Sequence, residues 1–174
     1  RMKQQTELWL VLEENESDQI WENVHKKFNF NPKGKSSLSP FTFTIPVDVY
    51  NIHDLSQKYE TAKKILISSF VKCMNNDEYM YALDWQHTDF RYNPRITTPK
   101  EDTFIADERY HGGGYNVYFP SFYPDGDYYF FIAKDFTWGY LTHPWLEKAW
   151  VFGNQFRDYI RQNSEDLGLS LCSE

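Results

Sequence analysis

The sequence lacks the features that define several large protein classes. It has only two cysteines, Cys73 and Cys172, which form neither a CxxC motif nor a Cys/His spacing typical of a zinc module. No stretch approaches the roughly 18 consecutive apolar residues that suggest a membrane-spanning helix, and none resembles a secretory leader. We therefore expect no resident metal, no cofactor, no membrane association and a cytoplasmic location.

Basic patches and familiar catalytic motifs are also missing. The net charge is −7, and the 18 lysines and arginines are scattered along the chain. A phosphate-binding surface is usually basic, so we expect no nucleic-acid partner, whereas a cationic protein partner is compatible with this charge. The chain contains no GxSxG, Walker A, GxGxxG or HExxH motif. These absences favour a non-catalytic protein.

Aromatic residues, in contrast, are abundant. They make up 19% of the chain, and they are densest between residues 115 and 156. Large rings can build a core or a binding surface. Alternation within strand-like segments favours the core for most of them. Trp138, Tyr140 and Trp145 lie near predicted turns, so they are the candidate binding residues, although a structural role for them is favoured.

Hydrophobic periodicity predicts one α+β domain over residues 1–174, with a largely antiparallel sheet of about six strands. Three helices, near 17–28, 54–74 and 154–163, are expected to pack mainly on one face of this sheet. Strands are predicted over residues 41–45, 79–85, 115–123, 128–133, 136–142 and 149–152. Residues 7–12 form a further strand or a docking segment, and residues 89–92 form another strand if the chain turns at 86–88.

Two segments are expected to be less regular. Residues 95–114 contain Pro99, many charges and three consecutive glycines, which predicts a mobile loop. Residues 164–174 are polar and predict a frayed tail. The alternation of Phe41, Phe43 and Ile45 with threonine predicts a half-buried strand, which Pro46 would end or place at a sheet edge.

Polar residues near predicted strand ends give one candidate site. Asp84, His87 and Asp89 lie close together in sequence, and Asp135 and His143 lie at later turns. Residues two apart on a strand share a face, so a His/Asp pair could bind a metal or act as an acid and base. The same residues could instead satisfy the backbone of turns, and this interpretation is favoured.

Four short motifs carry a resemblance to a known family. They are YALDWQH (81–87), YPDGDY (123–128), HPW (143–145) and VFG (151–153). This pattern resembles a family of small bacterial proteins catalogued only as a domain of unknown function. The resemblance covers about residues 17–157. It implies a single-domain, cytoplasmic α+β protein, and it supplies no catalytic residue.

Three functions follow as hypotheses. A non-catalytic protein-interaction module, such as an immunity-like protein that binds a toxin or another cationic protein, predicts an exposed aromatic patch rimmed by carboxylates. A small hydrolase-like enzyme predicts that the His and Asp candidates converge in a concave site. A carbohydrate-binding module predicts two coplanar exposed rings. The first hypothesis is favoured, and no signal indicates a particular oligomeric state.

Overall fold

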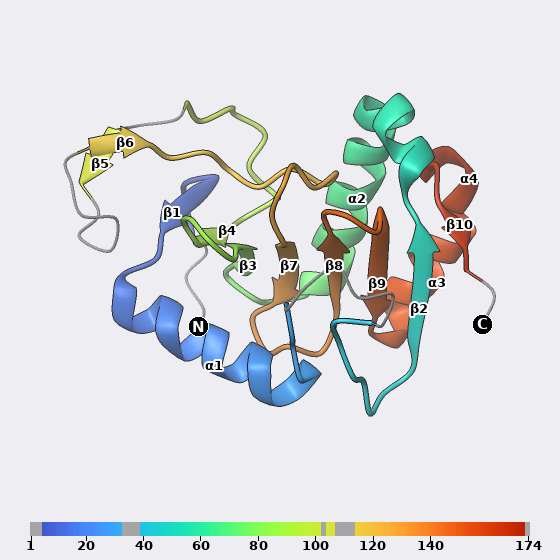
Figure 1. Cartoon of the computed structure of the whole chain (residues 1–174). Helices are drawn as coiled ribbons and strands as arrows, with labels where there is room; N and C mark the ends of the chain where they lie inside the picture. Colours follow the sequence, from blue (N-terminus) through green and yellow to red (C-terminus); the bar gives the residue numbers. More distant parts are fainter. Residues whose placement is uncertain (1–4, 33–38, 102–103, 107–113, 173–174) are drawn as a thin grey trace.

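The computed structural model describes residues 5–32, 39–101, 104–106 and 114–172. Within these ranges the chain has an α+β fold with four α-helices and two antiparallel sheets (Figure 1). None of the helices in the described ranges has the length and apolar character needed to cross a bilayer. The elements in chain order are β1 (Trp9–Val11), α1 (Glu14–Phe28), β2 (Val47–Asn51), the 3₁₀ helix η1 (His53–Lys58), α2 (Tyr59–Met74), β3 (Met80–Asp84), β4 (Phe90–Tyr92), β5 (Phe104–Ala106), β6 (Gly114–Asn116), β7 (Tyr129–Ala133), β8 (Gly139–His143), β9 (Lys148–Phe152), α3 (Asn154–Gln162), α4 (Ser164–Leu167) and β10 (Ser170–Leu171).

The main sheet has eight strands in the order β1-β4-β3-β7-β8-β9-β2-β10. Every neighbouring pair is antiparallel. The predicted antiparallel α+β architecture is therefore confirmed, but the sheet is larger than the six strands expected. Strands β5 and β6 form a separate two-stranded sheet.

The helices lie on both faces of the main sheet. Val24 and Phe28 of α1 belong to one apolar cluster with the sheet, whereas α2, α3 and α4 contribute to a second cluster. Figure 1 shows α1, in blue, well separated from α2, in green, and from α3 and α4, in red. The expectation that the helices pack mainly on one face agrees with the positions of α2, α3 and α4, whereas α1 covers the opposite face. Periodicity marks the apolar side of a helix but not the sheet face that it covers.

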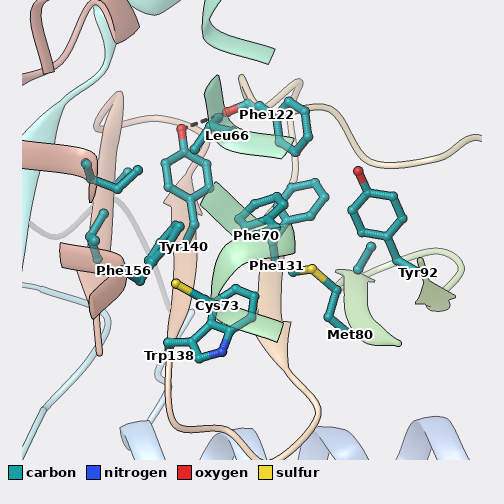
Figure 2. Close-up of a cluster of buried hydrophobic side chains, with 14 of the residues drawn as sticks. Leu66, Phe70, Cys73, Met80, Tyr92, Phe122, Phe131, Trp138, Tyr140 and Phe156 are labelled. Atoms are coloured by element: carbon teal, nitrogen blue, oxygen red, sulfur yellow. Dashed lines mark hydrogen bonds between the residues drawn. The ribbon is translucent and has the colours of Figure 1, made fainter. Parts of the chain in front are cut away.

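Central strands are buried on both faces because both are covered. In β3, Met80 and Ala82 belong to the α2 side, and Tyr81 and Leu83 belong to the α1 side. On the α2 side, Phe70 of that helix is fully buried among other rings (Figure 2). Its ring centroid lies 5.8 Å from Phe131, 5.8 Å from Trp138 and 5.6 Å from Phe156. Most of the aromatic surplus is therefore core, as alternation predicts.

Residues 41–45 form no strand, and the strand lies just beyond them at β2. The backbone N–H of Thr42 donates a hydrogen bond to the carbonyl of Phe28 (2.8 Å). This segment is therefore bonded to the end of α1 and does not pair with a strand of the sheet. Phe41 and Phe43 pack on the α1 side of the sheet from this irregular segment. Pro46 directly precedes the strand instead of ending it, a position where the missing N–H does not interrupt the ladder.

Residues 117–123 are also irregular, although a strand is predicted there. The backbone N–H of Phe122 donates to the hydroxyl of Tyr59 (3.1 Å), and the carbonyl of Phe122 accepts from the hydroxyl of Tyr140 (3.0 Å, dashed in Figure 2). Side chains of the core therefore replace the hydrogen bonds of a ladder. The aromatic alternation in this segment reflects burial against the α2 side of the sheet.

Both segments that were expected to be irregular contain regular secondary structure where the structure describes them. Residues 164–172, predicted as a frayed tail, form α4 and β10, and the N–H of Cys172 bonds to the carbonyl of Val49 (2.8 Å). Leu167 is fully buried, which anchors this end of the chain. The predicted loop at 95–114 lies partly outside the described residues, and its described part includes β5 and the first residue of β6.

Two glycines with positive φ allow a matched test of packing. A Cβ at Gly153 (φ +91°) would lie 2.3 Å from the Cβ of Trp138, whereas a Cβ at Gly126 (φ +77°) would meet nothing within 4 Å. Both substitutions to alanine cost about 1 kcal/mol for the backbone conformation, and overpacking adds about 1–3 kcal/mol at position 153 alone. Urea unfolding should therefore show Gly153→Ala to be clearly less stable than Gly126→Ala. Equal stability of the two variants would contradict the packing described for Trp138.

Candidate functional site

One end of the sheet collects most of the polar candidates. Asp84 at the end of β3 pairs with Tyr129 at the start of β7, and His143 at the end of β8 pairs with Lys148 at the start of β9. His87 therefore lies at the same end of the sheet as His143. Asp135 follows the other end of β7, beyond the pairing of Ala133 with Met80, so it lies at the opposite end of the sheet. The five candidates do not form one site.

The chain turns at residues 85–88 and returns as β4, so the hairpin alternative is confirmed. Asp89 begins the return, and its side chain is buried. It accepts hydrogen bonds from the hydroxyl of Ser17, from Nε1 of Trp21 (2.9 Å) and from the backbone N–H of Asp84 (3.0 Å). These contacts join α1 to the β3–β4 turn, which gives Asp89 a structural role.

Asp84 and His87 converge with a residue that the sequence suggests only as part of a turn. Nδ1 of His87 lies 3.1 Å from Oδ1 of Asp84 and 3.2 Å from Oδ2 of Asp127. The side chains of Asp84 and Asp127 are 8% and 4% exposed, whereas that of His87 is 60% exposed. Two buried carboxyl groups therefore contact one imidazole ring that is exposed to solvent.

This arrangement changes the protonation of Asp84. Burial, and then the hydrogen bond and charge of Asp127, raise the pKa of Asp84 to about 9. Asp84 is therefore protonated at neutral pH, because two buried carboxylates in contact cannot both ionise without compensation. Asp127 has further donors, since the N–H groups of Gln86 (2.9 Å) and Tyr128 (2.7 Å) bond to its two oxygens.

Asp48 is buried in a different environment. It accepts hydrogen bonds from Arg157 (3.0 Å) and from two nitrogens of Arg161 (2.8 and 2.7 Å). Burial by itself would raise the pKa of Asp48, but the hydrogen bonds and charges of Arg161 and Arg157 outweigh it and lower that pKa. Asp48 therefore ties β2 to α3 as a compensated ion pair.

His143 is a buried residue of a turn. Its Nδ1 accepts hydrogen bonds from the N–H groups of Trp145 (3.1 Å) and Leu146 (3.2 Å), so the ring proton lies on Nε2, which is 3.2 Å from the hydroxyl of Tyr128. Burial, and then the charge of Lys148, lower the pKa of His143 to about 4. His143 is therefore neutral near pH 7, and its described bonds organise the turn that leads to β9.

Asp135 likewise serves a turn. Its Oδ1 accepts from the backbone N–H (3.2 Å) and the hydroxyl (2.6 Å) of Thr137. It lines a cleft of about 440 Å³ together with Asp77 and Trp138. Burial, and then the charge of Asp135, raise the pKa of Asp77. This cleft is separate from the group formed by Asp84, His87 and Asp127.

The three candidate aromatic binding residues have different environments. Trp138 and Tyr140 are buried in the core on the α2 side, as Figure 2 shows. Trp145 is 57% exposed. Of the three candidate binding residues, only Trp145 is therefore exposed. Its ring centroid lies 5.9 Å from that of Tyr128 and 5.6 Å from that of His143.

A second histidine–carboxylate contact has no signal in the sequence. Nδ1 of His53 lies 2.6 Å from Oε2 of Glu147, and the hydroxyl of Tyr123 donates to the same oxygen (2.8 Å). The hydrogen bonds and charge of Glu147 raise the pKa of His53. The three residues come from distant parts of the sequence. The end of β2 pairs with the start of β9, and this pairing brings His53 close to Glu147. The contact could therefore not be predicted without knowledge of the strand order.

Comparison with known proteins identifies the family. A family model described as "Protein of unknown function (DUF2716)" matches residues 11–156. The chain belongs to this family. The Bacillus subtilis (strain 168) protein named "Uncharacterized protein YxiI" is 29% identical over 165 residues, which cover 87% of this chain and 91% of that protein. No solved structure matches. The matched DUF2716 region contains Asp84, His87, Asp127 and Trp145, and it confirms the resemblance predicted from the sequence.

The neutral state of His143 predicts a dependence of stability on pH. Its pKa is about 6.5 in the unfolded chain and about 4 in the folded protein, so the unfolded state takes up its proton first as the pH falls. His143 should therefore cost up to about 3 kcal/mol of folding stability between pH 7 and pH 4. In His143→Asn the amide oxygen can still accept a backbone hydrogen bond, but the side chain does not titrate.

The measurement is denaturant unfolding of both proteins across this pH range. Other titrating groups are shared, so the difference in unfolding free energy between them isolates His143. As the pH falls from 7 to 4, the unfolding free energy of the wild type should decrease more than that of His143→Asn. Parallel pH profiles would show that His143 is not held neutral by the fold.

Proposed function

We propose that this protein is a non-catalytic protein-interaction module that binds a basic partner protein through the surface around Trp145. The observation that carries this proposal is the exposure of Trp145 on a turn whose neighbouring residues are buried or half-buried. Trp145 is the only tryptophan among the large apolar side chains that the described residues expose. Tryptophan is enriched among the residues that dominate binding energy at protein interfaces.

Trp145 is held in a fixed position, which favours binding. Its backbone N–H is bonded to Nδ1 of His143, and its ring packs edge-on against Tyr128 at an interplanar angle of 85°. The ring of His143 contacts it at 71°. A side chain that is ordered before binding loses little conformational entropy when a partner covers it.

The net charge of the chain favours a basic partner. Close to Trp145 the charges are mixed, because Glu147 is paired with His53 and is followed by Lys148. The whole chain, however, carries a net charge of −7. A net charge of this sign attracts cationic proteins and accelerates their association. An immunity-like protein that blocks a cationic toxin is one role of this kind, by analogy with other small acidic proteins.

The two alternative functions have less support. For a hydrolase, the contact of Asp84, His87 and Asp127 is favourable, but His143 and Asp135 are engaged in separate turns. For a carbohydrate-binding module, two coplanar exposed rings are needed, and Trp138 and Tyr140 are buried. Both alternatives therefore rank below protein binding.

The proposal predicts that Trp145→Ala abolishes tight partner binding without unfolding the protein. The first step is affinity capture from the cell that carries the gene, followed by measurement of the purified pair. Loss of a central tryptophan should weaken binding by about 2 kcal/mol or more, which is about 30-fold. The affinity should also fall as salt rises, because opposite charges steer the complex.

Leu171→Ala is the matched control, since Leu171 is equally exposed at 57% but lies on β10 at the sheet edge. Its affinity should remain within about threefold of the wild type, as expected for a residue outside the interface. A partner that binds Trp145→Ala as tightly as the wild type would refute the proposed surface. A captured partner that is acidic would refute the proposed charge complementarity.

A further inference from the structure

The buried aspartates of the main sheet are compensated in different ways. Asp48 is neutralised by two arginines, and Asp89 is held by Ser17, Trp21 and a backbone N–H. Asp84 and Asp127 instead face each other, and within the described ranges no lysine or arginine forms an ion pair with either. Their ionic contact is with His87. A buried carboxylate pair of this kind needs a proton or a cation between its oxygens.

We propose that Asp84, His87 and Asp127 bind one divalent transition-metal ion of the series from Mn²⁺ to Zn²⁺. Each residue offers one ligand atom, and the three atoms all lie within 4.8 Å of one another. Carboxylate oxygens with an imidazole nitrogen suit these ions, whereas Mg²⁺ and Ca²⁺ favour oxygen ligands alone. This proposal is independent of the partner surface around Trp145.

The spacing of the ligand atoms fits such an ion. Nδ1 of His87 is 3.1 Å from an oxygen of Asp84 and 3.2 Å from an oxygen of Asp127. Around an ion with bonds of about 2.1 Å, neighbouring ligands lie about 3.0 Å apart at a right angle and about 3.4 Å apart at the tetrahedral angle. The two separations that involve His87 fall in this interval, and the oxygens of Asp84 and Asp127 lie within 4.8 Å of each other.

Contacts behind the ligands hold them in place. The N–H of Gln86 bonds to Oδ2 of Asp127, and the N–H of Tyr128 bonds to its Oδ1. The backbone of Asp84 is fixed through Asp89, which is in turn held by α1. Outer contacts of this type orient metal ligands and increase their affinity.

The site combines two buried ligands with one exposed ligand. The carboxyl groups form its buried floor, and the side chain of His87, at 60% exposure, forms its rim. An ion bound here would have three protein ligands on one side, with water completing the shell on the other. Three protein ligands are fewer than the four that close a structural zinc site, so we expect an affinity below that of such sites.

The test is direct metal binding by the full chain, freed of any polyhistidine tag and stripped with a chelator. Equilibrium dialysis against Zn²⁺ and Mn²⁺, followed by elemental analysis, should give one ion per chain. His87→Ala and Asp127→Asn should each lower the affinity by at least about tenfold. Excess Ca²⁺ should not displace Zn²⁺. The spectrum of bound Co²⁺ should lose its imidazole contribution in His87→Ala.

His53→Ala is the matched control, because His53 also contacts a carboxylate, at 2.6 Å from Glu147, but the side chain of Glu147 is 38% exposed instead of buried. It should bind as the wild type does. His87 is exposed, so His87→Ala should stay folded and report on binding even if Asp127→Asn does not. Failure of the wild type to bind either ion, equal binding by His87→Ala, loss of binding in His53→Ala, or displacement by Ca²⁺ would each overturn the proposal.

Discussion

Burial of both faces of the central strands determines where ionisable side chains can lie in this protein. Strands β3, β7, β8 and β9 carry helices or packed aromatic segments on each side, so nearly all their side chains lie in one of two apolar cores. A polar group inside such a sheet would be costly unless it were fully paired. Ionisable groups are therefore concentrated where strands end. Both the metal-ligand candidates and the fixed tryptophan lie at one such end, although they are separate features.

The buried carboxylates show how chemical context separates structural from functional groups. Asp48 is paired with two arginines, and Asp89 accepts hydrogen bonds from Ser17 and Trp21. Both carboxylates are therefore compensated, and they connect helices to the sheet. The buried imidazole of His143 also has a hydrogen-bond partner at each of its two nitrogens. Asp84 and Asp127 differ because two buried carboxyl groups are placed together without a lysine or arginine that pairs with them in the described part of the chain. An arrangement that costs stability in this way often marks a site with a ligand.

Several local features can be predicted from the sequence, whereas the relations between distant segments cannot. Alternation locates β3 within the strand predicted at 79–85, and helical periodicity locates α2 within the helix predicted at 54–74. The same alternation gives a false strand at 41–45, because rings that pack on a helix end resemble rings on a sheet. Asp127 is invisible as a partner of His87, since only the pairing of β3 with β7 brings the two together. The turn role favoured for His143 agrees with the hydrogen bonds that it accepts from the N–H groups of Trp145 and Leu146.

The edges of the sheet limit how another chain could join it. One edge is β1, with three residues, and the other is β10, with two. Short edge strands offer few free backbone groups, and they discourage the addition of a further strand from outside. Recognition by extending the sheet is thus disfavoured. At these two edges, association would therefore depend on side-chain contacts more than on backbone pairing.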